Sequence, residues 1–287
     1  MRLLLTGGSG FTGRYVERQA QLEGHTVTQL GCDLTDPVAT REAVQRAAPS
    51  HVVHLGAISA VTHQDELALY RVNLFGTLNL LKAIDALAER PERVILASSA
   101  NVYGNSDKSP IREDAPTSPV NHYAMSKLAM EHMSRGSFAD RLPLVWTRPF
   151  NYTGVGHDQR FVIPKLVHHF ATRQARVELG NLDVEREFND VRPVAEVYLR
   201  LLAHGLPGET YNICSGRPVS LRTAVESLQR LSSHAMEVSV NPAFVRPNEV
   251  FRLSGSPDKL YGCIGPVAYR ELDETLSWML AAATTPQ

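Results

Sequence analysis

The sequence predicts an α/β fold, a doubly wound parallel sheet with a smaller, interleaved lobe in the C-terminal part of the chain. Three observations support this prediction. Short β-rich runs alternate with amphipathic helices as far as about residue 150, which is typical of helices packed on both faces of a parallel sheet. A glycine-rich turn separates the first run from the first helix, and the alternation breaks down after Pro149.

The first 150 residues contain the regular part of the pattern. Short apolar runs predict buried strands, and apolar residues spaced three and four apart predict the helices that cover them. The strands are expected at 2–6, 25–30, 51–54, 93–98 and 143–147. The helices between them are expected at 12–23, 37–47, 66–89 and 121–138.

After Pro149 the predicted elements are shorter and less regular. We expect a helix at 162–173, a short strand at 176–179 and a helix from Val191 to Leu202 that returns to the main sheet. The remaining residues are expected to form a small lobe, with a strand at 210–213, a helix at 221–231 and a strand at 236–240.

The composition is that of an ordinary globular protein. The 287 residues have a formal net charge of −1 and no basic stripe, so neither nucleic acid nor an anionic membrane surface is expected as a partner. Cys32, Cys214 and Cys263 are odd in number and lack metal-ligand spacing, which favours reduced thiols and no metal site. The first strand begins directly after Met1 and no apolar run approaches membrane-spanning length, so a cytoplasmic protein is expected.

The turn after the first strand has the pattern that holds a pyrophosphate group. Gly7, Gly10 and Gly13 follow the apolar run 3–5 and open a helix. Glycines at this spacing allow a tight turn, close approach of the backbone to phosphate and close packing of helix on strand, while the helix N-terminus offers N–H groups and a positive dipole. A structural loop is the alternative, and the strand before and the helix after favour phosphate binding.

The motif and the alternation together predict a domain division. Residues 1–150 are expected to form a Rossmann-like dinucleotide-binding domain, with a returning segment at about 186–207. Residues 151–185 and 208–287 are expected to form mainly the substrate-binding lobe.

A second motif lies in the middle of the chain, at Tyr123 and Lys127. Residues four apart share one face of a helix, and an ammonium group beside a phenol lowers the tyrosine pKa toward the range that suits general acid or base catalysis. An ordinary exposed helix would explain this pair alone. Ser98 and Ser99, however, follow the apolar run 93–97 at the carboxyl end of a predicted parallel strand, where active sites of open sheets lie. The two motifs together indicate a nicotinamide enzyme.

With these residues in view, the chain resembles the extended short-chain dehydrogenase/reductase family, in the branch that acts on nucleotide-diphosphate sugars. The resemblance runs almost from end to end. Within the branch, the chain is most similar to the GDP-4-keto-6-deoxy-D-mannose reductases (GDP-6-deoxy-D-mannose reductases), through Arg148-Pro149-Phe150-Asn151, the stretch GNLDVEREFNDV at 180–191 and YNICSG at 211–216.

The resemblance implies the functional residues. The family's catalytic triad corresponds to Ser99, Tyr123 and Lys127, and the last two also contact the cofactor. The other cofactor-binding positions correspond to Gly7, Gly10, Phe11, Thr12, Gly13, Arg14, Asp33, Leu34, Leu55, Gly56, Ala57 and Asn73. The substrate-binding positions correspond to Asn151, Val162, Lys165, Arg186, Arg246 and Glu249, although each charged residue alone would also suit an ordinary surface.

The expected cofactor is NADP(H) or NAD(H), with a slight preference for NADP(H). The second strand ends at Gln29-Leu30-Gly31, without the acidic residue that binds the ribose 2′-hydroxyl of NAD. Arg14 is a candidate for binding a 2′-phosphate, and the alternative is that it is a solvated helix residue.

The resemblance also implies the reaction. It is reduction of the C4 keto group of a nucleotide-diphospho-4-keto-6-deoxy sugar, foremost GDP-4-keto-6-deoxy-D-mannose to GDP-D-rhamnose, with Tyr123 as proton donor. Related 4,6-dehydratases carry an acid pair after the triad hydroxyl, and Ala100 and Asn101 at those positions cannot protonate a leaving hydroxyl. Reductase-epimerases have a cysteine where Ala100 stands, so inversion at C3 or C5 is also disfavoured. An NAD-dependent 4-epimerase and a catalytically silent nucleotide-binding protein stay open as alternatives.

The long helices predicted at 66–89 and 121–138 carry apolar residues such as Leu74, Met125 and Met133. Packing into the core would explain these residues. The resemblance adds that two such helices pair across a dimer, so a homodimer is expected.

Overall fold

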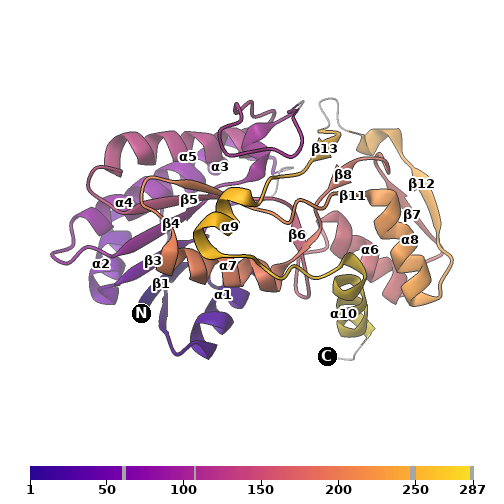
Figure 1. Cartoon of the computed structure of the whole chain (residues 1–287), viewed down its shortest axis with the longest axis horizontal. Coiled ribbons are helices and arrows are strands. Elements are labelled where there is room, and N and C mark those ends of the chain that lie inside the picture. The colour runs from indigo at the N-terminus through magenta and orange to yellow at the C-terminus, as the bar shows by residue number, and fades with distance from the viewer. Residues whose placement is uncertain (60–62, 107, 246–249, 285–287) are drawn as a thin grey trace.

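A six-stranded, fully parallel sheet forms the centre of the larger part of the molecule in the computed structural model (Figure 1). The structure describes residues 1–59, 63–106, 108–245 and 250–284. The spatial order of the strands is β10-β5-β4-β3-β1-β2, so the chain starts near one edge and reverses its direction of winding between β1 and β3. The strands are β1 Arg2–Thr6, β2 Thr26–Gln29, β3 His51–His54, β4 Arg93–Ala97, β5 Leu144–Pro149 and β10 Thr210–Ile213.

Helices cover both faces of this sheet because alternate strand residues point to opposite sides. Leu3 and Leu5 belong to one apolar core, together with Val16 of helix α1, whereas Leu4 belongs to the other. The first face is covered by α1 Phe11–Leu22 and α7 Val191–His204, and the second by α2 Pro37–Ala47, α4 Thr77–Asp85 and α5 His122–Phe138. The predicted doubly wound parallel sheet is confirmed.

The helix expected at 66–89 is instead three segments ending at Asp85. They are α3 Glu66–Tyr70, the π-helical segment η1 Arg71–Gly76 and α4. Within η1 the backbone carbonyl of Asn73 accepts a hydrogen bond of 2.7 Å from the Thr77 hydroxyl. π-Helical segments are rare and often lie at functional sites, and the periodicity of the sequence does not distinguish such a segment from an α-helix.

A smaller lobe lies at the other end of the molecule (Figure 1). Its apolar core is made by helices on one side of a two-stranded parallel sheet, and it includes Ile163, Leu228 and Leu276. The elements are α6 Val162–Ala171, β7 Arg176–Leu179, α8 Leu221–Ser232, β12 Glu237–Val240, the 3-10 turn η3 Pro242–Phe244 and α10 Leu272–Thr284.

The strand at 210–213 was expected in the lobe, and that placement is wrong. It is β10, the edge strand of the main sheet, where Thr210 pairs with Trp146 and Ile213 with Pro149. Helix α9 Asp258–Ile264, which was not predicted, lies against β10 and α7. The local pattern predicts a strand correctly, but a strand's partner is set by contacts far away in sequence. How the chain divides into a cofactor domain and a lobe stays a prediction.

Short strand pairs connect the sheet to the lobe. β6 Tyr152–Thr153 pairs with β9 Asn189–Asp190, and a three-stranded sheet has the order β11-β8-β13. Its strands are β8 Glu185–Arg186, β11 Val219–Ser220 and β13 Arg252–Leu253.

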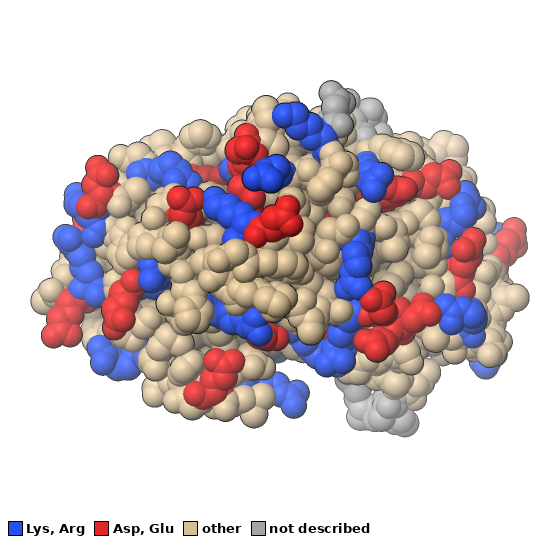
Figure 2. All heavy atoms as spheres, in the orientation of Figure 1, with Lys and Arg blue, Asp and Glu red and all other residues tan. Residues whose placement is uncertain are grey.

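Charged side chains of both signs are interspersed over the surface in Figure 2, without a region of one sign on the face shown. Among the described residues no helix combines the length and the apolarity needed to span a bilayer.

Candidate active site

The glycine turn between β1 and α1 has no room for side chains at two of its predicted positions. Gly7 has φ +69°, and a Cβ atom there would lie 2.8 Å from the backbone nitrogen of Gly56. A Cβ atom on Gly13 would lie 2.1 Å from the carbonyl oxygen of Gly7. The turn, the start of α1 and the loop after β3 are therefore in direct backbone contact, as close approach to a dinucleotide requires.

Helix α1 begins with an open N-terminus. Its N-cap is Gly10, which offers no side chain to the first-turn N–H groups, and the first turn contains no acidic residue. Uncapped N–H groups and the positive end of the helix dipole favour a phosphate group at this place. Phe11 stacks on the ring of His157 at 4.3 Å, and the hydroxyl of Thr12 hydrogen-bonds that of Tyr152 at 2.7 Å. These two predicted cofactor residues thus join the turn to the segment after β5.

A cavity of about 250 Å³ opens beside the glycine turn at the carboxyl ends of β1, β2 and β3. The lining includes five residues that were predicted to bind the cofactor. The lining residues are Thr6, Gly7, Leu30, Cys32, Asp33, Leu34, Gly56, Ala57, Ile58 and Val72. The glycine turn without side chains, the open helix end and this cavity together fit a dinucleotide.

The loop after β3 is held by buried hydrogen bonds. The Leu55 N–H donates to the Thr6 carbonyl at 3.2 Å, and the Gly56 N–H donates to the Thr6 hydroxyl at 3.0 Å. His54 lies between the hydroxyls of Thr6 and Thr77, at 2.6 and 2.7 Å, and burial lowers its pKa to about 3. A neutral imidazole therefore supports the cavity wall at physiological pH.

Asn73, predicted to contact the cofactor, lies behind this wall. It is 1% exposed, accepts the Ile58 N–H at 2.8 Å and donates to the Ile58 carbonyl and the Ser126 hydroxyl, both at 3.0 Å. The side chain thus ties the loop after β3 to helix α5. Contact between Asn73 and a cofactor stays a prediction.

The predicted catalytic residues come together at the carboxyl end of β4. Ser99 follows the strand, and its hydroxyl lies close enough to Tyr123 on α5 to lower the pKa of that phenol, against the larger effect of burial. Tyr123 and Lys127 share the inner face of α5 and are 8% and 5% exposed. The neighbouring Ser98 Oγ is buried and has no hydrogen-bond partner in the described part of the chain, so Ser99 is the serine that the structure connects to the tyrosine.

The electrostatics of the pair differ from the expectation. Lys127 Nζ donates to the carbonyl of Ala97 at 2.8 Å, and burial lowers the pKa of this lysine to about 8, an effect that Glu131 partly opposes. Burial raises the pKa of Tyr123 to about 12, so the predicted lowering by Lys127 is wrong for this structure. Desolvation disfavours the charged phenolate, so Tyr123 is a protonated phenol that can act as a proton donor.

A buried ion pair that the sequence analysis did not single out holds the same helix. Arg148 on β5 donates to both carboxylate oxygens of Glu131, at 3.0 and 2.7 Å, and to the Tyr103 hydroxyl at 3.0 Å. Glu131 lies one turn after Lys127 on α5. The only signals of this ion pair in the sequence were the four-residue spacing of Glu131 from Lys127 and the motif Arg148-Pro149-Phe150-Asn151.

The structure places three of the predicted substrate residues after β5 and on helix α6 of the lobe. Asn151 is exposed, and Val162 is the first residue of α6. Lys165 donates to the Glu178 carbonyl at 3.2 Å and lies 5.6 Å from the centre of the Phe244 ring.

Two further predicted cations have protein partners, and a third lies outside the described residues. Arg186 donates to the carbonyls of Glu185, Val250 and Phe251. Arg246 and Glu249 lie outside the described residues. Arg14, predicted near the cofactor, donates to the Gly156 carbonyl at 3.1 Å. The roles of these residues toward a ligand stay predictions.

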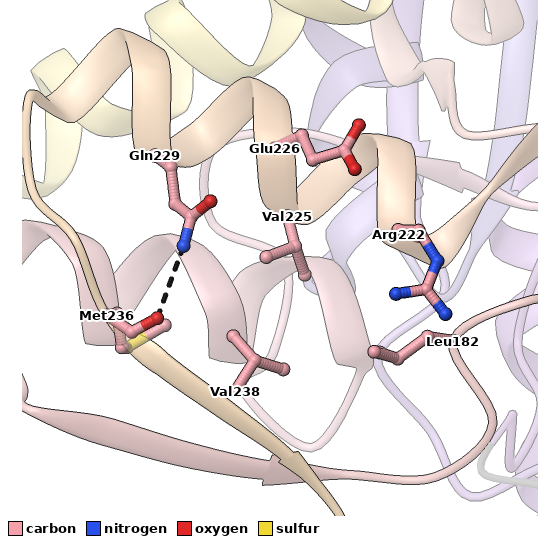
Figure 3. Close-up of a pocket in the computed structure, with 7 residues that line it drawn as sticks. All are labelled: Leu182, Arg222, Val225, Glu226, Gln229, Met236 and Val238. Atoms are coloured by element: carbon pink, nitrogen blue, oxygen red, sulfur yellow. Dashed lines mark hydrogen bonds between the residues drawn. The ribbon is translucent and has the colours of Figure 1, made fainter.

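A second hollow, also of about 250 Å³, lies in the lobe and contains none of the predicted residues (Figure 3). Leu182, Val225 and Val238 point into it, and Gln229 donates to the Met236 carbonyl at 3.2 Å. Among the described residues no cluster of three or more His, Cys, Asp or Glu side chains could hold a metal ion.

A parallel sheet with a glycine turn at its first strand and a Ser-Tyr-Lys set at its fourth defines the class of short-chain dehydrogenases and reductases. Comparison with known proteins agrees. Residues 3–214 match the NAD dependent epimerase/dehydratase family. The chain belongs to this family and is an NAD(P)-dependent enzyme of the oxidoreductase type.

The relatives of the chain include two proteins named for GDP-linked deoxysugars. GDP-6-deoxy-D-talose 4-dehydrogenase of Aggregatibacter actinomycetemcomitans is 35% identical over 271 residues, with 92% of each chain covered. GDP-6-deoxy-D-mannose reductase of Pseudomonas aeruginosa is 34% identical, with 92% of this chain and 91% of the relative covered. The structure of RMD from Pseudomonas aeruginosa complexed with NADPH superposes with a TM-score of 0.88 at 31% identity, covering 98% of this chain and 97% of that one.

Proposed function

We propose that the chain reduces the C4 keto group of GDP-4-keto-6-deoxy-D-mannose to give GDP-D-rhamnose. The observation that carries this proposal is the buried, protonated Tyr123 close to Ser99 at the carboxyl end of β4, since ketone reduction needs a proton donor there. The absence of an acid at Ala100 and Asn101 argues against dehydration. Both named relatives act on GDP-linked 6-deoxy sugars according to their names, which supports the substrate class.

The residues have distinct tasks in this proposal. Tyr123 donates its proton to the oxygen of the reduced carbonyl, and Ser99 hydrogen-bonds that oxygen as negative charge develops. Lys127, which donates to the Ala97 carbonyl at the carboxyl end of β4, binds the nicotinamide ribose. It also stabilises the phenolate form of Tyr123 after the proton has been donated. When bound, NADPH or NADH supplies the hydride.

We assign the main sheet, with residues 1–150, the returning segment 186–207 and strand β10, to the cofactor and the lobe to the nucleotide sugar. NADP(H) stays the preferred cofactor because β2 ends without an acidic residue. The Gln29 side chain there packs over Gly8, where a Cβ would lie 2.6 Å from its amide carbon. Asn151, Val162, Lys165 and Arg186, with Arg246 and Glu249, are the proposed contacts to the sugar nucleotide.

The proposal includes a homodimer. Helix α5 exposes Met125 and Met133, at 42% and 48%, and the adjacent segment from α3 to η1 exposes Leu67 and Phe75, at 72% and 56%. An apolar face of this kind on two neighbouring helices suits the same face of a second copy.

The test measures consumption of NADPH and NADH in parallel with GDP-4-keto-6-deoxymannose formed in place from GDP-mannose, and identifies the product by NMR. Oxidation of the cofactor with a 6-deoxyhexose product is expected, and Tyr123→Phe should lower kcat at least about 100-fold with little change in substrate affinity. Equal losses in kcat and in substrate affinity would contradict the role of Tyr123. No oxidation with either cofactor would refute the reductase and favour a 4-epimerase, identified by tightly held NAD and no net cofactor consumption.

A further inference from the structure

Asn101 lies two residues after Ser99, in the 3-10 turn η2 Ala100–Tyr103, and touches the catalytic hydroxyl twice. Its backbone N–H donates to Ser99 Oγ at 3.2 Å, and its side-chain Nδ2 donates to the same oxygen at 3.0 Å. Ser99 itself is 5% exposed, so water has little access to its oxygen.

The two contacts use the whole accepting capacity of the serine. A hydroxyl has one hydrogen to donate and two lone pairs to accept with. Because Asn101 fills both lone pairs, the Ser99 hydrogen must point away from Asn101 toward another acceptor. The Tyr123 phenol oxygen, which lies close enough to Ser99 for the serine to lower the pKa of Tyr123, and the oxygen of a bound substrate are the acceptors that the active site offers.

We propose that Asn101 is a positioning residue that makes Ser99 an obligatory hydrogen-bond donor in the active site. This inference rests on the proposed function, because the donated hydrogen is useful where a carbonyl oxygen becomes an alkoxide. Because the Ser99 hydrogen points away from Asn101, it is available to the substrate oxygen when substrate binds, beside the phenol hydrogen of Tyr123. A carboxylate at position 101 accepts only, so it would draw the Ser99 hydrogen away.

The test compares Asn101→Asp and Asn101→Ala with the matched control Asn105→Asp, an exposed residue of the same turn region. Asn101→Asp should lower kcat about 100-fold at pH 8 with KM nearly unchanged. Its kcat relative to wild type should then recover at least about tenfold toward pH 5, because a protonated aspartic acid donates to Ser99 as the amide does. Asn101→Ala should lose activity without this acid recovery, and Asn105→Asp should behave as wild type.

An Asn101→Asp profile parallel to that of wild type would overturn the inference. Neutron diffraction from cofactor-loaded crystals decides the same question without turnover. Deuterium on Asn101 Nδ2 facing Ser99, and on Ser99 Oγ facing Tyr123, is expected. An Asn101 carbonyl oxygen facing Ser99 would refute the inference. Lack of wild-type turnover on every nucleotide sugar would refute the proposed function alone, since the neutron map would still decide the direction of the hydrogen bonds.

Discussion

Removing the charge of Glu131 should destabilise the protein more than any surface substitution. The Glu131 and Arg148 side chains are 4% and 9% exposed, and Glu131→Gln leaves the guanidinium buried without a counter-charge. Loss of one partner of a buried pair costs about 3–5 kcal/mol. The Tyr103 hydroxyl and the Glu113 carbonyl still accept from Arg148, so the lower end of that range is expected.

The corresponding change in melting temperature follows from the size of the chain. An unfolding entropy of about 2.1 cal/mol/K per residue gives about 0.6 kcal/mol/K for 287 residues, so a loss of about 3 kcal/mol lowers Tm by about 5 °C. Calorimetry at pH 7 measures it, with Glu226→Gln on the exposed side of α8 as the control, which should shift Tm by less than about 1 °C. Equal Tm values for Glu131→Gln and the wild type would show that the ion pair contributes nothing to stability and would refute the reasoning.

Three further predictions use other parts of the structure. Lys127→Met should abolish turnover yet raise Tm at pH 7 by up to about 5 °C, because a pKa lowered from 10.5 to about 8 means that burying the ammonium costs about 3 kcal/mol. Between pH 8 and 10.5 only the unfolded chain binds a proton at this lysine, so the free energy of unfolding of the wild type rises with pH in this range. The difference in Tm between Lys127→Met and the wild type should therefore vanish near pH 10. Gly13→Ala should weaken NADPH binding at least about tenfold in a fluorescence titration, whereas Gly262→Ala, with no atom within 4 Å of the added methyl, should not. Met133→Asp should give monomers in light scattering. Leu206→Asp, in the loop after α7 where the leucine is 60% exposed, should leave the oligomeric state unchanged.

The sequence predicts local structure well because local structure has a local cause. The helix at 37–47 and the strand at 51–54 match α2 and β3, since each shows its own periodicity and, for α2, an N-cap Asp36 followed by Pro37. The glycine turn is predicted equally well, because the turn has no room for side chains and the glycines show this directly in the sequence.

The remaining features depend on contacts between distant residues. The pairing of β10 with β5, the hydrogen bond from Lys127 to Ala97 and the carbonyl partners of Arg186 all join segments that no spacing relates. The tyrosine pKa was misjudged for the same reason: a helix spacing shows the neighbouring ammonium group but not how deeply both groups are buried. The sequence predicted which residues meet, and burial decided their protonation.

The position of β10 at the edge of the main sheet also bears on how the protein is made. During synthesis, β5 is made well before β10, its partner on one side. That edge of β5 has no partner strand until the ribosome has added Thr210–Ile213, which follows the first elements of the lobe. During that interval the apolar strand Leu144–Pro149 presents an unpaired backbone edge, which is a site for association with other chains. Slow synthesis between residues 150 and 213 would therefore lengthen the period in which the nascent chain depends on chaperones.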